Sequence, residues 1–380
     1  MAALRLRETL LYSALRVAHA FDQRRPDPAQ LGTAAIGRIL VVSSTAIGDT
    51  LLSTPALRSL REAYPGARIS LLINAAYTEM FRDHPRVDEL IPYRGGWRRF
   101  LSLAQELSAR HFDLACILHG NEPQATPLAY LSGARFIFKL PNTSRFRFLL
   151  TNPEPVLDWD DFAHGIDQRL AVAKLGGGAA TDRRMELPIA DGARRDIASL
   201  LSSHGLTPDA PLVAFQAGAS TVSRRWAPSR YVDLGRRLLA ARPDVRIVLT
   251  GSPAEQPLTD AIAAGIGDAR AWNSAGKVPL PLLAALVERC TLMVSGDTGP
   301  MHLAVTVGTP VVALFAVSDW RRSGPAYDLE RHVVIQKWRT CDPCLSKNCP
   351  YAEPICMENI SVDEVYAAVI EVLERRTTVR

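Results

Sequence analysis

The 380-residue sequence contains no apolar run approaching the roughly 20 residues that a helix needs to cross a bilayer. It also lacks an excess of one charge, because 44 Lys and Arg stand against 39 Asp and Glu, for a formal charge of +5. Nucleic-acid-binding proteins usually concentrate basic residues on one face, and no such stripe is present, so nucleic acid is not expected as a partner. The mild positive charge fits anionic small ligands or an anionic membrane surface better.

The sequence also lacks the Gly-x-Gly-x-x-Gly fingerprint that follows the first strand of dinucleotide-binding folds. At that place the chain reads Ser43-Ser-Thr-Ala-Ile-Gly-Asp49-Thr50, in which Gly48 is the only glycine. Hydride transfer with a nicotinamide cofactor is therefore disfavoured.

Residues 1–34 are expected to form an amphipathic helix and a linker that contains Pro26 and Pro28. The apolar residues of the helix recur on one face, namely Leu4, Leu11, Leu15 and Ala18. Such a helix either contacts a membrane surface or packs on its own domain, and the sequence leaves both open. Glu8 and Arg16 make the apolar stretch too short for a secretory signal. We therefore expect a cytoplasmic protein, peripheral on the inner membrane if the helix binds lipid.

The rest of the chain alternates strands and helices in two consecutive series, which predicts parallel sheets with helices on both faces. Strands are expected at 38–44, 68–73, 87–92 and 112–118, and then at 212–216, 246–250, 292–295 and 311–315. The sequence therefore predicts an α/β protein with two doubly wound, Rossmann-like domains at 35–190 and 191–360. The ends of their strands are expected to face a central cleft.

Asp49 stands at the start of the helix that follows the first strand. In one interpretation the helix dipole favours a carboxylate there. In the other, Asp49 is a general base at the carboxyl edge of a parallel sheet. Position alone favours the structural interpretation.

Three further loops follow strands of the second series. The segment Ser295-Gly-Asp-Thr-Gly-Pro-Met-His302 opens a helix, where free N–H groups and the dipole suit an anion or the residues simply cap the helix. A Gly-containing turn with Ser220, Thr221 and Arg224 suits phosphate oxygens, unless it is a solvated basic loop. Glu255 either accepts from a ribose hydroxyl or is an ordinary first-turn residue.

Four of the six cysteines lie within sixteen residues in a CxxC-x4-C-x6-C pattern, namely Cys341, Cys344, Cys349 and Cys356. They could hold zinc or iron tetrahedrally, remain free thiols, or include a disulfide. Cys116 and Cys290 are isolated and are expected to be small core residues.

Taken together, these residues resemble glycosyltransferase family 9, the heptosyltransferases of lipopolysaccharide core assembly. The resemblance runs from Arg38 to the final helix. Its motifs are Gly48-Asp49 with Leu51 and Thr54-Pro-Ala-Leu57, then Arg225-Trp-Ala-Pro228, and Gly296-Asp-Thr-Gly-Pro-Met-His-Leu-Ala304. The last of these is the most specific.

The resemblance implies a GT-B fold, an ADP-heptose donor, inversion at the anomeric carbon and no cofactor or metal for catalysis. It implies an acceptor-binding first domain, a donor-binding second domain and a C-terminal helix at 361–380 that crosses back to the first domain. The implied site residues are Asp49 as base, Ser220 and Thr221 in a phosphate-contacting loop, Glu255 on the ribose, and Asp297, Thr298, Gly299 and His302 in the donor loop. One departure is Arg224, since the family commonly has lysine there, and a planar guanidinium grips a diphosphate differently.

Cysteine-rich segments recur in the family near 341–356, and some members that glycosylate proteins bind iron there. The acceptor is left open between the lipopolysaccharide core, another glycan and a protein serine. The alternatives to a lipopolysaccharide enzyme are a protein heptosyltransferase, a nucleotide-sugar epimerase of the same fold, and a sugar-binding protein without catalysis.

Overall fold

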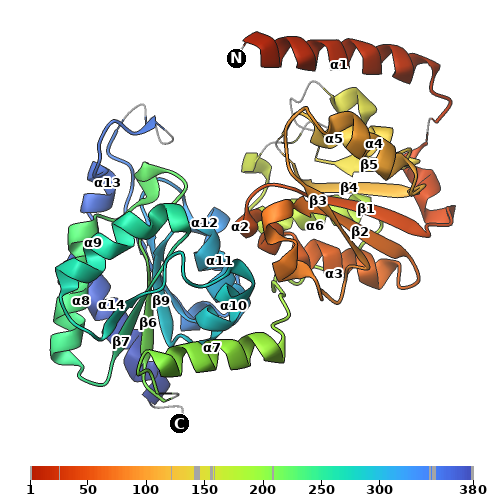
Figure 1. Cartoon of the computed structure of the whole chain (residues 1–380). Coiled ribbons are helices and arrows are strands. Elements are labelled where there is room, and N and C mark those ends of the chain that lie inside the picture. Colours follow the sequence, from red (N-terminus) through yellow and green to blue (C-terminus); the bar gives the residue numbers. More distant parts are fainter. Residues whose placement is uncertain are drawn as a thin grey trace. The chain divides into compact units, whose positions relative to one another are not determined.

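The computed structural model describes residues 2–24, 26–120, 122–140, 146–154, 157, 159–207, 209–341, 344 and 348–377, without the side chains of 2–5, 376 and 377. The chain divides into two compact units, Met1–Pro188 and Ile189–Arg380 (Figure 1). This division falls two residues before the domain boundary expected from the sequence. No helix in the described part of the chain is both long enough and apolar enough to cross a membrane.

The first unit is built on a parallel sheet with the order β3-β2-β1-β4-β5. Its strands are β1 (Arg38–Ser43), β2 (Arg68–Asn74), β3 (Glu89–Tyr93), β4 (Leu114–His119) and β5 (Phe136–Lys139). The first four match predicted strands to within two residues at each end, whereas β5 was not predicted. The central strand β1 is buried on both faces from Ile39 to Ser43, as its unbroken β-branched and apolar run requires.

Helices cover both faces of this sheet (Figure 1). They are α1 (Ala2–Phe21), α2 (Ile47–Leu52), α3 (Thr54–Ala63), α4 (Phe100–Ser108), α5 (Ala125–Leu131) and α6 (Gly165–Leu175). Short 3-10 turns lie at η1 (Pro28–Thr33), η2 (Ala75–Tyr77), η3 (Glu79–Phe81), η4 (Arg147–Leu149) and η5 (Trp159–Asp161). One apolar cluster joins α1, α4 and α5 to the sheet face that carries Leu40 and Val42.

The N-terminal helix α1 packs on its own unit. Leu15 is buried in the apolar cluster of α4 and α5, and Leu11 packs against it. Rings extend the contact, since Tyr12 meets Phe148 edge to face at 5.5 Å between centroids. Of the predicted apolar face, Ala18 is exposed, and the side chain of Leu4 lies outside the described residues. Packing on its own domain is therefore confirmed for Leu11 and Leu15, but not for the whole of the predicted face.

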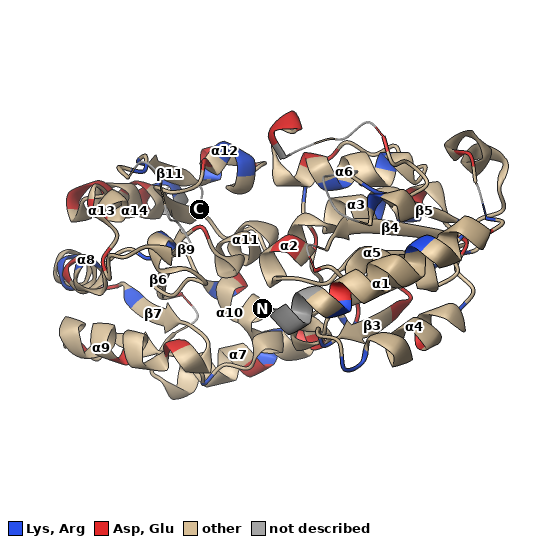
Figure 2. Cartoon of the chain, turned by 90° about the horizontal axis from the view of Figure 1, so that it is seen from above, with Lys and Arg blue, Asp and Glu red and all other residues tan. Residues whose placement is uncertain are grey.

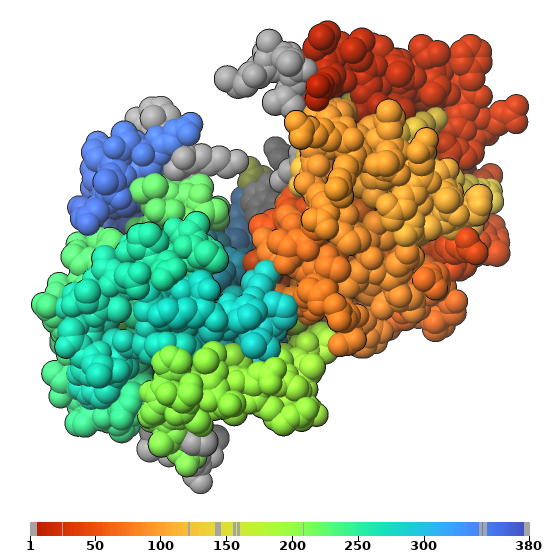
Figure 3. Space-filling view, in the orientation of Figure 1, coloured from red at the N-terminus to blue at the C-terminus, as the bar shows by residue number. Residues whose placement is uncertain are grey.

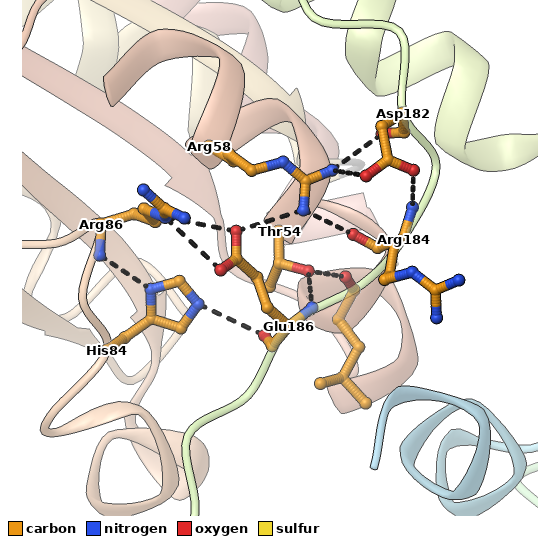
Figure 4. Close-up of polar contacts among 8 residues, drawn as sticks. Thr54, Arg58, His84, Arg86, Asp182, Arg184 and Glu186 are labelled. Carbon is orange, nitrogen blue, oxygen red and sulfur yellow. Dashed lines mark hydrogen bonds and ion pairs between the residues drawn. The ribbon is translucent and has the colours of Figure 1, made fainter. Parts of the chain in front are cut away.

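The last segment of the first unit is fastened by a polar network on α3 (Figure 4). Thr54 Oγ1 accepts a hydrogen bond from the backbone N–H of Glu186 at 3.0 Å, and the Glu186 carboxylate pairs with Arg58 at 3.4 Å and with Arg86 at 3.3 Å. Arg58 also donates to the carbonyl of Arg184 at 3.0 Å. The chain therefore leaves the first unit along a defined path.

The second unit is built on a parallel sheet with the order β11-β10-β9-β6-β7-β8. Its strands are β6 (Leu212–Gln216), β7 (Arg246–Thr250), β8 (Ala271–Asn273), β9 (Leu292–Gly296), β10 (Val311–Phe315) and β11 (Val333–Gln336). The strands β6, β7 and β10 have their predicted bounds, and β9 is one residue longer. The edge strands β8 and β11 were not predicted.

The helices of the second unit again lie on both faces of its sheet. They are α7 (Asp191–Ser203), α8 (Pro228–Ala241), α9 (Gln256–Ile266), α10 (Leu280–Arg289), α11 (Gly299–Thr306), α12 (Trp320–Ser323), α13 (Ile355–Glu358) and α14 (Val362–Thr377). Short 3-10 turns lie at η6 (Val222–Arg224), η7 (Pro253–Glu255) and η8 (Leu329–Arg331). Two consecutive doubly wound parallel sheets are thus present, as the sequence predicts.

The C-terminal helix α14 packs within the second unit, and the expectation that it crosses back to the first domain stays a prediction. Val365, Val369 and Val372 are buried in the same cluster as Trp226 and the apolar residues of α8. The indole N–H of Trp226 also donates to the carbonyl of Ile360 at 2.9 Å, just before α14 begins. An amphipathic helix buries its apolar face against another apolar surface, and for α14 that surface is formed by α8.

Candidate functional site

In the first unit, Asp49 lies in the first turn of α2, directly after the loop that leaves β1. It is not the N-cap, because that position is Ala46, which has no side chain able to cap. Its carboxylate accepts hydrogen bonds from the Thr45 hydroxyl at 2.9 Å and from Arg169 Nη2 at 2.9 Å. The carboxylate remains partly open to solvent, with 28% of the side chain exposed. Asp49 is therefore held by specific donors rather than by the helix dipole alone.

Arg169 reaches Asp49 from α6, and its side chain is 1% exposed. It also donates to the carbonyl of Gly165 at 2.7 Å and to Ser53 Oγ at 3.2 Å, which fixes the guanidinium plane. Burial lowers the pKa of Arg169, and the neighbouring Asp49 carboxylate opposes that effect. A buried cation without a partner is very costly, so Arg169 and Asp49 depend on one another.

His119 closes the group at the end of β4. Its Nδ1 lies 2.7 Å from the Thr45 hydroxyl oxygen, and its Nε2 lies 3.4 Å from Asp49 Oδ1. Burial lowers the pKa of His119 to about 4, with a further contribution from Arg169. The ring is therefore neutral at neutral pH. Because the Thr45 hydroxyl donates to Asp49, it must accept from Nδ1–H, which fixes the tautomer of His119.

A second cation lies nearby on β5, where Lys139 Nζ donates to the carbonyl of Gly120 at 3.2 Å. Burial lowers the pKa of Lys139. The carboxylates of Asp49 and Glu122, one neutral imidazole and two cations thus lie around the ends of β1, β4 and β5, with Glu122 accepting from the Ser44 hydroxyl at 3.3 Å. A carboxylate or a neutral imidazole can deprotonate a hydroxyl group, and the cations can hold an anionic group.

The sequence singled out Asp49 alone in this group. His119 directly follows the predicted strand 112–118, so the rule that sites gather at the carboxyl ends of parallel strands could have found it. Lys139 ends a strand that was not predicted. Arg169 is 120 residues from Asp49 in the sequence, and no local pattern points to it.

In the second unit, the loop after β9 carries the predicted donor residues. Thr298 caps α11, since its hydroxyl accepts from the backbone N–H of Met301 at 3.4 Å and lies 2.9 Å from Ser295 Oγ. The helix begins at Gly299. Asp297 is buried at 6% exposure, and its Oδ2 accepts from the Ser318 hydroxyl at 2.7 Å. His302 Nε2 lies 4.0 Å from Asp297 Oδ1.

The loop after β6 meets this donor loop. Arg224 Nη1 lies 3.5 Å from Asp297 Oδ2 and donates to the Asp297 carbonyl at 3.4 Å. Gly296 lets the two loops approach, because a Cβ there would lie 2.5 Å from the carbonyl oxygen of Arg224. Arg225 instead braces its own loop through the carbonyl of Ala219 at 2.9 Å.

The remaining predicted donor residues lie in the loops that follow β6 and β7. Ser220 is exposed, whereas Thr221 is half-buried and accepts from the Ser223 hydroxyl at 3.3 Å. Glu255 Oε2 accepts from the backbone N–H of Ser252 at 2.8 Å and from its hydroxyl at 2.9 Å, so part of its role is to cap η7. Its Oε1 lies beside Gly218, where a Cβ would be 1.8 Å away. Glu255 therefore has the structural role of capping η7, and it also lies beside the loop that follows β6.

The cysteine cluster is not supported as a metal site. Cys341, Cys344 and Cys349 are partly buried, Cys356 is buried, and all four are free thiols. Within the described ranges, no group of three or more His, Cys, Asp or Glu residues is placed to hold a metal ion. Burial raises the pKa of the Cys356 thiol, which suits a core residue rather than a thiolate ligand. Cys116 and Cys290 are buried, as predicted.

One protein family matches more than half of the chain. The family described as glycosyltransferase family 9 (heptosyltransferase) matches residues 100–354. Lipopolysaccharide heptosyltransferase 2 of Salmonella typhimurium is 27% identical over 304 residues, which are 74% of this chain and 83% of that protein.

Two solved structures share the fold. The family 9 glycosyltransferase of Veillonella parvula has a TM-score of 0.76 at 25% identity, covering 89% of this chain and 97% of its own. The E. coli ADP-heptose lipopolysaccharide heptosyltransferase II has a TM-score of 0.74 at 22% identity, covering 90% and 99%.

Proposed function

Because this chain belongs to glycosyltransferase family 9, the heptosyltransferases, we propose that it transfers heptose from ADP-heptose to a hydroxyl of the lipopolysaccharide core. The chain is a glycosyltransferase of GT-B fold, with its two parallel-sheet α/β units. The observation that supports these substrates is the similarity of the chain, across both units, to heptosyltransferases. A core acceptor would place the enzyme at the cytoplasmic surface of the inner membrane.

The second unit holds the donor in this proposal. Arg224 and the N-terminus of α11 at Thr298 and Gly299 offer positive charge and N–H groups to the diphosphate. Asp297 orients Arg224 at 3.5 Å, and Ser318 holds Asp297 in turn. Ser220 and Thr221 add hydroxyls, Glu255 takes the ribose, and His302 lies against Asp297.

The first unit supplies the base. Asp49 removes the proton of the acceptor hydroxyl, whose oxygen attacks the anomeric carbon of the heptose. The bond from that carbon to the diphosphate oxygen breaks, and ADP leaves with the electron pair. A single displacement of this kind inverts the anomeric configuration. Thr45 and Arg169 support the assignment because they fix the position of the carboxylate and leave it partly open to solvent.

The charge that grows on the departing diphosphate is balanced by Arg224 and the start of α11 in this proposal, in the place that a metal ion takes in other transferases. Transfer rates should accordingly be unchanged by a chelator such as EDTA. Loss of activity in EDTA, restored by added Mg²⁺, would contradict this part of the mechanism.

The test is incubation of the purified protein with ADP-heptose and a panel of acceptors, with mass spectrometry of the products. A core acceptor should gain the mass of one heptose as ADP is released. An altered donor without transfer would identify an epimerase, and a modified peptide serine would identify a protein heptosyltransferase. Neither alternative is favoured by relatives that are lipopolysaccharide enzymes.

A further inference from the structure

The outer face of α1 carries an uncovered apolar stripe. Its members are mostly exposed, namely Leu6 at 61%, Leu10 at 61%, Val17 at 60% and Phe21 at 83%. At about 100° per residue these positions fall within roughly 60° of the helix circumference. Leu15, on the opposite side, is the residue buried in the first unit. In Figure 3 α1 forms a ridge on the surface of that unit.

The stripe is not needed to hold α1 in place. The helix is anchored on its inner side by Leu15 and by ring contacts of Tyr12 with Phe148 and of His19 with Tyr130. Among the described residues, four of the nine exposed large apolar side chains lie on this one helix. Exposed apolar residues are ordinary when scattered, whereas a contiguous row marks an interaction surface.

The charges beside the stripe indicate what covers it. Arg7 and Arg16 are exposed and flank the stripe, one on each side. The guanidinium of Arg16 also lies over the Phe148 ring, 4.9 Å from its centroid, so Arg7 is the more open of the two cations. Glu8 is the only acidic residue of α1, and it falls on the inner half of the helix, about 20° from Leu15. Figure 2, which looks onto α1, shows its few charged residues interrupting an otherwise uncharged helix. An apolar centre with basic borders is typical of a helix lying in the interface of an anionic bilayer.

We propose that α1 docks the protein onto an anionic phospholipid surface. Leu6, Leu10, Val17 and Phe21 enter the boundary between headgroups and acyl chains, and Arg7 and Arg16 meet the phosphates. A second copy of the chain is the weaker occupant, because two outer faces would bring arginines together with no acidic partner. The inference does not depend on sugar transfer, and it would bring the proposed enzyme to the surface where a lipid-linked acceptor lies.

The test is sedimentation of the full-length protein with vesicles, in the absence of sugar donor and acceptor. We expect binding to phosphatidylglycerol–phosphatidylethanolamine vesicles that weakens with salt, and much weaker binding to phosphatidylcholine. The pair Leu10→Gln and Val17→Gln should lower the partition constant roughly tenfold or more, since each change removes the burial of an aliphatic side chain. The pair Arg7→Gln and Arg16→Gln should lower it only on anionic vesicles, by about tenfold.

Leu329→Gln is the matched control, because Leu329 is an exposed leucine of the second unit at 50%, and it should bind as the wild type does. The proposal is overturned if the wild type fails to sediment with anionic vesicles, or if the α1 variants bind as tightly as it does. A variant that turns a dimer into a monomer without changing vesicle binding would show that a second copy covers the stripe instead. Vesicle binding is measured without sugar donor or acceptor, so these results would be the same if the protein did not transfer heptose.

Discussion

The carboxylate of Asp49 accepts a hydrogen bond from the guanidinium of Arg169 at 2.9 Å, and the Arg169 side chain is 1% exposed. The proposed base is thus also the counter-ion of a buried cation. The Thr45 hydroxyl donates to the other oxygen of the same carboxylate, and the neutral His119 ring lies 3.4 Å from the oxygen that Arg169 holds. Any change at Asp49 therefore acts on the reaction and on the stability of the first unit together, and the two effects must be separated by experiment.

In the donor loop, Asp297→Asn should weaken ADP binding about tenfold or more without unfolding the protein. Asn keeps an oxygen for the Ser318 hydroxyl but loses the charge that orients Arg224. Titration calorimetry with ADP measures the change. Asp268→Asn, which removes a comparable charge from a pair with Arg270, serves as the control. An unchanged ADP affinity in a folded Asp297→Asn protein would remove Asp297 from the donor site.

Gly296→Ala should disturb the same site through the backbone. The new Cβ would lie 2.5 Å from the carbonyl oxygen of Arg224, so the loop after β6 must move. We expect a loss of about 1–3 kcal/mol of stability and weaker ADP binding. Gly66→Ala is the control, because a Cβ there meets nothing within 4 Å. Thermal melts and calorimetry of both variants test this, and equal behaviour would mean that the two loops are not in contact.

Much of this arrangement could be predicted from the sequence, because its causes are local. The apolar runs that become β1, β6, β7, β9 and β10 are bounded by turn residues, and parallel strands place the loops that follow them at one edge of the sheet. That rule picked out Asp49, Arg224 and Asp297, which the structure places in the segments after β1, β6 and β9. The edge strands β5, β8 and β11 are only three or four residues long. Segments of that length are too short for the hydrophobic pattern of a strand to be recognised in the sequence.

What could not be predicted is decided by contacts distant in the sequence. The apolar face of α14 indicates that the helix packs against something, but the sequence does not show that its partners are α8 and Trp226. Arg169 meets Asp49 across 120 residues, and nothing around it in the sequence distinguishes a buried arginine from a surface one. The outer stripe of α1 was likewise hidden, because the helix is apolar on two faces and only packing shows which one is covered.

Stability should fall as the pH is lowered from about 6.5 to about 4. Burial lowers the pKa of His84, His119 and His332 to about 4 each. Between these values and the ordinary 6.5 the unfolded chain binds more protons than the folded one, so the free energy of unfolding decreases as the pH drops. One pKa unit corresponds to about 1.4 kcal/mol, so His84 and His332 each contribute roughly 3 kcal/mol at the acid end, and His119 acts in the same direction.

Denaturant unfolding at a series of pH values measures this dependence. His332→Gln should flatten the curve in that window while keeping an acceptor for the backbone N–H of Val311, which His332 Nδ1 holds at 3.2 Å. Carboxylates whose pKa is lowered in the folded protein, such as Asp88 and Asp319, add to the loss only below about pH 5, where the unfolded chain begins to protonate them. The part of the curve between pH 6.5 and about 5 therefore reports on the histidines. A flat stability curve between pH 6.5 and 4 would contradict the prediction.

The last prediction separates the two roles of Asp49. Asp49→Asn keeps the shape of the side chain but leaves the buried Arg169 without its counter-ion, so we expect a stability loss of about 3–5 kcal/mol. Arg169→Met in the same chain removes the stranded charge and should restore most of that stability. If Asp49 is the general base, the double variant still transfers heptose at least about a hundredfold more slowly than the wild type, since a lost base costs typically ~10²–10⁴ in rate. ADP affinity, measured on the same protein, should be unchanged because the residues proposed to bind the donor lie in the other unit. Transfer at close to the normal rate by the well-folded double variant would show that Asp49 only neutralises Arg169. The base would then have to be another residue. His119 is the first candidate, because its imidazole is neutral and lies 3.4 Å from the same carboxylate.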